Sequence, residues 1–499
     1  MSTGVSTAGG PPLTPTGQPP ALRRSIGAVT ATATSAGLAF AAINFLGIVS
    51  IGTYAAGASS WLAILVGGGI ALVVAGVFSE LNSMWPTAAG VRLYVAGAFG
   101  VRFALIATFT YMSTVILVIA ADAFLIGAAI QHMLGEPPVL AYLWILVLLA
   151  LATVLNLRGV RLAGRVQSIV TYTVLASTVV VSIAALVHPG MAFTAPFALF
   201  GAGPLSGFQA IAFGLFLFAA FEWVTTTAEE ARTPKVITRG LFIAPALIWL
   251  TATMFSLGLD HLVPKNAAHG SPYPQLLLGQ AALGRLGEIW MLAVTVLTAI
   301  NTFNGGFLVA SRFVYAAARE NNLPRPFARL NLRAVPWLSV LVLAAASAVV
   351  GALVFATGQW LLLVAVGAAL EAAVFAIASA ALLKLRRRDT PPRGFRLRAA
   401  PVLAGGGTVL FAGLAMASGL SDPQDPTRFS PVPALVVIAL GVVSTAYVVW
   451  VVPRLQRAAA ARRVAARATG EPTRRRPPRP PATEPTTTAP DPSGPAATG

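Results

Sequence analysis

The chain has 499 residues, of which 56% are hydrophobic, only 10% are charged and none is cysteine. Soluble domains carry about 25% charged residues, so this composition predicts a protein that meets lipid over most of its surface. The lack of cysteine excludes disulfides, thiolate nucleophiles and cysteine-ligated metals. The formal net charge of +18 would suit nucleic acid, but the placement of the basic residues along the chain favours a membrane explanation.

Twelve apolar stretches are long enough to cross a bilayer, which takes about 20 residues in a helix. They must be helices, because the bilayer core offers no hydrogen-bond partners to unpaired backbone groups. The expected spans are 32–56, 61–84, 103–131, 139–156, 167–187, 207–228, 238–259, 286–317, 337–356, 359–383, 401–420 and 432–452. The predicted fold class is therefore an all-α integral membrane protein with twelve transmembrane helices.

The basic residues alternate between the connecting segments. If the N-terminus is cytoplasmic, the inside segments hold 31 Lys and Arg, whereas the outside segments hold 3, namely Lys265, Arg285 and Arg428. This bias is the positive-inside signal. It predicts a multi-pass protein of the cytoplasmic membrane with both termini in the cytoplasm, and it explains the net charge without any nucleic acid.

Both ends of the chain lack large apolar side chains. Residues 1–24 are rich in Thr, Pro and Gly, and residues 453–499 in Ala, Arg, Pro and Thr. We expect a disordered cytoplasmic arm and a disordered cytoplasmic tail. The nine arginines of the tail indicate either a solvated extension or a contact with anionic lipid, at about 1 kcal/mol per basic residue. Interruption by Pro and Thr favours the solvated extension.

Acidic residues lie in or near several of the expected spans, among them Glu80, Asp122, Glu222 and Glu371. A charged group in lipid is costly, so each is a candidate functional group. Burial disfavours the charged form of any carboxyl group, so such an acid can couple a proton gradient to transport by binding and releasing a proton. We predict Glu222 as the proton-coupling and gating residue, with Asp122 and Glu371 as alternates. A purely structural hydrogen bond is the other interpretation.

Aromatic side chains crowd the segment before Glu222 in the sixth span. The pattern fits a packing face with one acid turned to a crevice, or a substrate wall with a titratable group beneath it. The cost of an acid at this depth favours the second interpretation. The predicted substrate-binding residues of this span are Phe216, Phe218, Ala220 and Phe221.

The first span places Asn44, Gly47 and Ser50 in mid-membrane. Gly costs a helix about 1 kcal/mol relative to Ala, so a break here would free backbone groups for a ligand; helix packing through small residues is the alternative. The first and sixth spans are each the first of five consecutive spans. Because five is odd, the second set of five crosses the membrane in the opposite orientation to the first. The sequence predicts a five-plus-five inverted repeat over residues 25–400, whose discontinuous first helices meet at the midplane, and two further helices over 401–452.

The eighth span carries Asn301 and Asn304 among apolar residues. Both are expected to face the helix bundle, where hydrogen bonds between helices and contact with substrate are equally supported. Tyr111 of the third span is interpreted as a packing residue unless the fold places it at the site.

Three segments together are similar to amino acid–polyamine–organocation permeases. They are residues 79–90 at the end of the second span, 229–235 after the sixth and 310–324 at the end of the eighth. The resemblance covers roughly residues 25–450. It implies the sodium-coupled leucine-transporter fold and uptake or exchange of amino acids or related amines. It also implies that the carboxylate and amino groups of the substrate meet broken backbone in spans one and six, and that the aromatic residues of span six form a gate.

Three positions depart from the family pattern. Ala220 stands where a Gly usually precedes the last aromatic residue of span six. Asn44 or Gly47 occupies the place of a closely spaced Gly pair in span one, and Val174 stands where some members carry Lys.

The predicted function is a secondary active transporter that moves an amino acid across the cytoplasmic membrane by alternating access, proton-coupled or as an exchanger. A transporter of a polyamine or another organic amine is the alternative, and it needs two or more carboxylates in the pocket. An integral-membrane enzyme is disfavoured, because no nucleophile–base set or metal-ligand spacing is present. The expected partners are the small-molecule substrate and the bilayer. No cofactor or metal is expected, and the coupling ion is a proton or sodium.

Overall fold

The computed structural model describes residues 22, 24–54, 60–135, 137–189, 210–211, 214–269, 271–388, 394–424 and 428–468. Within these ranges every regular element is helical, and the β pairings are two isolated bridges, Ile26 with Ala231 and Ser421 with Phe429. The prediction of an all-α protein is confirmed for the described part of the chain.

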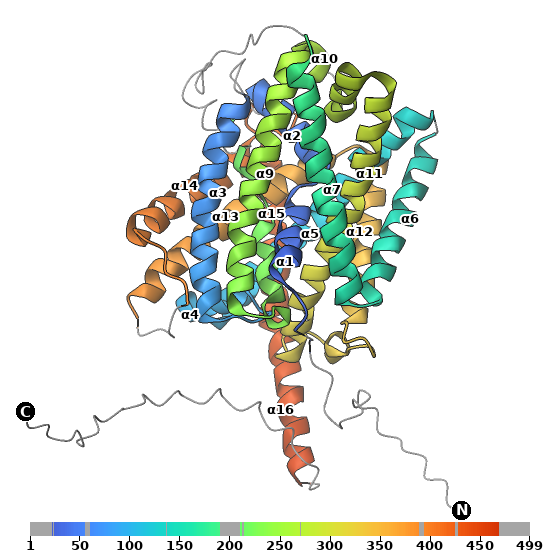
Figure 1. The fold of residues 1–499 in the computed structure, drawn as a ribbon. Coiled ribbons are helices and arrows are strands. Elements are labelled where there is room, and N and C mark those ends of the chain that lie inside the picture. Colours follow the sequence, from blue (N-terminus) through green and yellow to red (C-terminus); the bar gives the residue numbers. More distant parts are fainter. Residues whose placement is uncertain are drawn as a thin grey trace, which may run out of the picture.

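The long helices run side by side in one bundle (Figure 1). The elements in chain order are α1 (Ala28–Ala39), α2 (Ile43–Tyr54), α3 (Ser60–Met84), α4 (Val91–Phe99), α5 (Val101–Leu134), α6 (Pro138–Leu157), α7 (Val160–Val187), the 3-10 helix η1 (Phe221–Glu230), α9 (Pro234–Leu262), α10 (Lys265–His269), α11 (Pro274–Arg319), the 3-10 helix η2 (Arg325–Ala328), α12 (Trp337–Thr357), α13 (Trp360–Arg386), α14 (Ala400–Leu420), α15 (Val432–Ala446), the π-helical turn η3 (Tyr447–Val451) and α16 (Val452–Ala468).

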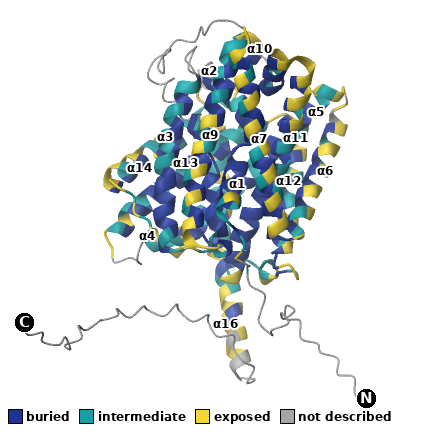
Figure 2. Cartoon of the chain, in the orientation of Figure 1, coloured by how far each residue is buried: buried dark blue, intermediate teal, exposed yellow. Residues whose placement is uncertain are grey.

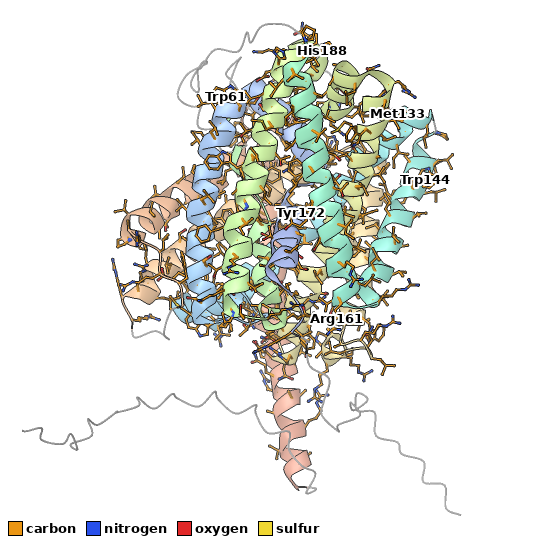
Figure 3. All side chains as sticks on the ribbon, viewed as in Figure 1. Trp61, Met133, Trp144, Arg161, Tyr172 and His188 are labelled. Carbon is orange, nitrogen blue, oxygen red and sulfur yellow. The ribbon has the colours of Figure 1, made fainter. Side chains whose placement is uncertain are left out.

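Ten helices of the described part are long and apolar enough to cross a membrane. The pair α1 and α2, bent by 59° at its break, would form an eleventh span. The expected sixth span, 207–228, includes residues outside the described part, so the count of twelve stays a prediction. Exposed residues lie on the outer faces of the bundle (Figure 2). Many of the exposed residues are large and apolar, as helices that contact lipid require. Trp144 on α6 is one of them (Figure 3).

The first span is broken, but not where the sequence placed the break. α1 ends at Ala39 and α2 begins at Ile43, so Gly47 and Ser50 lie within a helix, and the Ser50 hydroxyl donates to the Leu46 carbonyl. Tertiary contacts create the break upstream of these residues. It frees the backbone around residues 40–42, not the segment centred on Gly47.

The end of the bundle where the described chain starts and α16 leaves is rich in ion pairs; we call it the basic end. Arg312 pairs with Glu230 at 2.8 Å, and both side chains are only 1% exposed. Arg319 pairs with Glu229, and Arg92 pairs with Glu320. These contacts join α4, η1 and α11.

Several acids of the basic end serve two partners. Glu229 Oε1 accepts a hydrogen bond from the Ala88 backbone N–H as well as from Arg319. Glu320 accepts from Arg92 and from the Asn322 side chain. The segment before α1 joins this network, because the backbone N–H groups of residues 25 and 26 donate to the Glu230 carbonyl.

The chain after α15 differs from the predicted disordered tail. α16 continues to Ala468 and extends away from the bundle (Figure 1). Gln456 on α16 donates to the Asn322 side chain at 3.0 Å. The first part of the predicted tail 453–499 is therefore helical and touches the basic end, and residues 469–499 lie outside the described part, as does nearly all of the predicted arm 1–24.

Candidate functional site

The two broken spans meet inside the bundle. The Asn44 side chain donates to the carbonyl of Ala39 at the end of α1 and, at 2.8 Å, to the carbonyl of Leu217 in the sixth span. The Ser35 hydroxyl donates to the Phe221 carbonyl at 2.7 Å. Asn44 therefore satisfies backbone groups that both breaks would leave without partners. The structure brings the two candidate segments together, as the sequence predicted.

The sixth span breaks just before η1. Ala220 adopts φ 72°, in the left-handed region, which costs an L-residue roughly 1–2 kcal/mol. This is the position where the resemblance expects Gly. The Ala220 N–H points at α13 and donates to Glu371 Oε1 at 2.7 Å. A buried carboxyl group therefore satisfies the backbone at the break.

Glu222, Glu371 and Tyr111 converge from three elements, η1, α13 and α5; we call them the carboxyl cluster. All three side chains are buried. The Tyr111 hydroxyl donates to Glu222 Oε1, and the Glu371 carboxyl group lies close to both Glu222 and Tyr111. The Tyr111 ring also stacks on Trp223. Tyr111, interpreted from the sequence as a packing residue, thus belongs to the site.

In the described part of the chain, the carboxyl cluster has no basic partner. None of the five ion pairs in the described residues includes Glu222 or Glu371. One oxygen of each carboxyl group, Oε2, has no hydrogen-bond donor. Two neighbouring carboxylates away from water repel each other, and a single proton held between such groups removes one charge and supplies a hydrogen bond. The arrangement is therefore suited to hold and release a proton.

The predicted aromatic residues of span six differ in their surroundings. Phe218 and Phe221 are fully buried, and Phe221 packs edge-to-face against Phe375 of α13. Phe216 is partly exposed. Of the three, Phe216 is the side chain that packing inside the protein covers least.

Asp122 lies at the other break. It is fully buried, and its Oδ1 accepts a hydrogen bond from the Ile43 N–H at the start of α2, at 3.0 Å. It stands eleven residues after Tyr111 on α5, about 16 Å along the helix axis at 1.5 Å per residue. The structure therefore joins Glu371 to Glu222 but places Asp122 at a separate position.

Asn301 and Asn304 belong to a buried network that ties α11 to α6 and α7. Asn301 Oδ1 accepts hydrogen bonds from Gln167 and Thr171. Asn304 donates to Gln167 and accepts from Asn156. These contacts favour the interpretation of hydrogen bonds between helices over direct contact with substrate.

Elsewhere in the described chain, no group of three or more His, Asp or Glu side chains is arranged to hold a metal ion.

The family model for amino acid permeases matches residues 31–453 of the chain. Among characterised relatives, the aromatic amino acid transport protein AroP of Corynebacterium glutamicum is 28% identical over 61% of this chain and 69% of its own length. The branched-chain amino acid permease BcaP of Lactococcus lactis is 24% identical over 68% of this chain and 77% of its own length. Transport, and not catalysis, is what these proteins share.

Solved transporter structures share the fold. The manganese transporter of Eremococcus coleocola superposes with a TM-score of 0.58 and 13% identity, covering 86% of this chain and 95% of its own. A Na⁺-coupled sialic acid symporter superposes with a TM-score of 0.53 and 14% identity, covering 80% of this chain and 91% of its own. At these identities the likeness shows the fold alone, which is the leucine-transporter type.

Proposed function

We propose that this chain, which belongs to the amino acid permease family and is a transporter rather than an enzyme, moves an amino acid across the cytoplasmic membrane as a secondary active transporter. Transport follows alternating access in twelve spans, ten of them in a five-plus-five inverted repeat. The relatives named for aromatic and branched-chain amino acids support an amino acid as the substrate. The strong bias of Lys and Arg supports cytoplasmic termini, and a C-terminal reporter active only outside the cell would contradict this topology.

The observation that carries the proposal is the carboxyl cluster beside the break of the sixth span. Glu222 and Glu371 lie together without a basic partner, and each has an oxygen without a donor. Because the members come from α5, η1 and α13, any movement of η1 relative to the other two separates the carboxyl groups. Separation changes how strongly a shared proton is held. We assign Glu222 as the group that binds and releases the coupling proton, and Glu371 as its partner.

Uptake into proteoliposomes tests this function. The purified chain is reconstituted and offered labelled amino acids with a pH gradient, with a sodium gradient, with neither, or with unlabelled substrate inside. A proton-coupled transporter takes up its amino acid fastest when the outside is acidic, and it does not need sodium. Uptake that follows only the sodium gradient contradicts coupling to protons. Uptake that requires internal substrate assigns an exchanger.

Transport of an organic amine or polyamine is the second candidate. It is supported by the same pair of buried carboxyl groups, since a cationic substrate needs two or more acids to replace its hydration. Adding putrescine and spermidine to the uptake panel separates the candidates. Uptake of these amines without uptake of any amino acid would replace the first proposal with the second.

A further inference from the structure

The carboxylate of Asp122 occupies the start of α2. The first N–H groups of a helix have no partner within the helix and carry the positive end of its dipole, so they attract anions. Here the Ile43 N–H donates to Asp122 Oδ1 at 3.0 Å. α2 has twelve residues, so it presents a full helix terminus to this carboxylate.

The groups around Asp122 do not neutralise it. Within the described residues, no ion pair includes Asp122, and its Oδ2 has no hydrogen-bond donor, although the Thr302 hydroxyl of α11 lies nearby. Ile43 and Ala121, which adjoins Asp122 in the sequence, belong to an apolar cluster formed with Leu46, Leu125, Trp360, Leu363 and Val364. The start of α2 is thus the main electrostatic partner of this buried acid.

The start of a half-helix at a broken span is also where transporters of this architecture meet anionic groups of their substrates. An amino acid offers its carboxylate to such a position. In this protein, a carboxylate of the chain itself is already there. Two carboxyl groups in one buried place cannot both accept hydrogen bonds from the same N–H groups, and they repel each other when both are charged.

We propose that Asp122 is an internal competitor of the substrate carboxylate. Without substrate it binds the start of α2, and an amino acid displaces it when its own carboxylate binds there. Asp122 therefore determines specificity, because it weakens the binding of carboxylate-bearing ligands and leaves ligands without a carboxylate unopposed. This inference rests on the proposed function, since it takes the substrate to be an amino acid.

Binding of matched ligand pairs tests the competition. The probes are L-phenylalanine, L-leucine and L-lysine, each compared with its decarboxylated amine: phenethylamine, isopentylamine and cadaverine. The first variant is Asp122→Asn, which removes the charge but keeps the acceptor oxygen and the volume. The second is Asp122→Ser, whose shorter side chain also loses the hydrogen bond to the Ile43 N–H. Asp260→Asn is the matched control, because Asp260 is a partly buried acid at the end of α9 and belongs to neither of the two broken spans.

In Asp122→Asn we expect the Kd of the amino acid to fall about tenfold, whereas the Kd of the matching amine does not fall. We expect Asp122→Ser to change the ratio of amino acid Kd to amine Kd in the same direction. The outcome therefore does not depend on the folding of a single variant. Asp260→Asn binds both ligands as the unchanged protein does. An amino acid Kd that is unchanged or higher in both Asp122 variants, or an equal gain for the amine, overturns the competition.

The uptake of the same amino acids by the unchanged protein separates the two hypotheses. If the unchanged protein takes up the amino acids but the ratio of amino acid Kd to amine Kd is unaltered in the Asp122 variants, only the competition is overturned. Absence of amino acid uptake contradicts the proposed function. If no variant binds any of the three amino acids, the vacated start of α2 does not receive a carboxylate, and the competition is also wrong.

Discussion

The two ends of η1 carry the same residue type in opposite surroundings. Glu222, near its start, lies against Tyr111 and another acid, and no described residue forms an ion pair with it. Glu229 and Glu230, at its end, each pair with an arginine of α11. A carboxylate beside an arginine keeps its charge and holds helices together, whereas a carboxyl group beside another carboxyl group can exchange a proton. One ten-residue helix thus separates a structural end from the end that we propose binds the proton, which we call the proton-binding end.

The largest expected effect lies at the structural end. Arg312→Leu leaves Glu230 charged and buried, and breaking a buried ion pair in this way costs about 3–5 kcal/mol. We expect a large drop in the thermal unfolding temperature in detergent. The double variant Arg312→Leu/Glu230→Leu, which removes both charges, regains most of that loss. Equal stability of the single and double variants would show that the pairing is not what holds this end.

The aromatic segment before the proton-binding end comes next. Phe216→Ala removes a partly exposed ring and is expected to weaken substrate binding by about 1–3 kcal/mol, with little change in stability. Phe221→Ala removes a fully buried ring packed on Phe375, so it lowers the unfolding temperature as well. Binding assays and thermal unfolding of both variants check this. If both variants bind substrate with unaltered affinity, the pocket lies elsewhere.

At the proton-binding end, Glu222→Gln keeps the shape of the side chain but cannot titrate. We expect this variant to bind substrate normally, and its uptake driven by a pH gradient to fall about tenfold, a typical contribution of one positioned acid–base group at the low end. The rate of uptake by this variant no longer depends on external pH. The matched variant Glu229→Gln, at the paired end, retains the pH dependence. If Glu222→Gln keeps the pH profile and rate of the unchanged protein, the proton site is not Glu222.

A smaller effect is expected from the backbone that precedes Glu222. Ala220→Gly relieves the left-handed conformation and raises stability by up to about 1 kcal/mol, because the relief exceeds the extra chain entropy of Gly. The Ala220 N–H keeps its contact with Glu371, so the pH dependence of uptake is unchanged. Thermal unfolding measures the gain. A loss of stability would mean that the methyl group of Ala220 contributes packing that outweighs the backbone strain.

The smallest effect is expected beyond the basic end. Deleting residues 469–499 leaves substrate affinity unchanged, because this segment lacks apolar side chains to pack. Deleting residues 453–499 also removes the contact of Gln456 with Asn322 and costs at most about 1 kcal/mol, as one exposed hydrogen bond does. Affinity measurements on both truncations check this. A large loss from the shorter deletion would reveal a role in binding for the arginine-rich segment.

The sequence predicts a role for Glu222, because an acid in lipid is costly and therefore noticeable wherever it lies. It named Glu371 only as an alternate and set Tyr111 aside. Residues 111, 222 and 371 are more than a hundred positions apart, and helical periodicity predicts which face a residue occupies but not which faces converge. The pairing of these side chains depends on how α5, η1 and α13 pack, and single-sequence patterns do not contain it.

Two errors have different causes. The break of the first span was placed around Gly47, because Gly disfavours helix, but contacts of Asn44 and Asp122 with distant backbone place it at residues 40–42. The helix α16 was missed although its signal was present. Residues 457–468 are mostly Ala and Arg, which have high helix propensity. The lack of apolar residues was given too much weight there.

The shared partners at the basic end have a kinetic consequence. Glu229 joins Ala88 to Arg319, and Glu320 joins Arg92 to Asn322, so a movement of either acid breaks both of its contacts together. Such coupling makes separation of these helices cooperative. The basic end should therefore open in one step, without partly open states that last. Single-molecule fluorescence between labels on α4 and α11 should then show two dwell levels and no third.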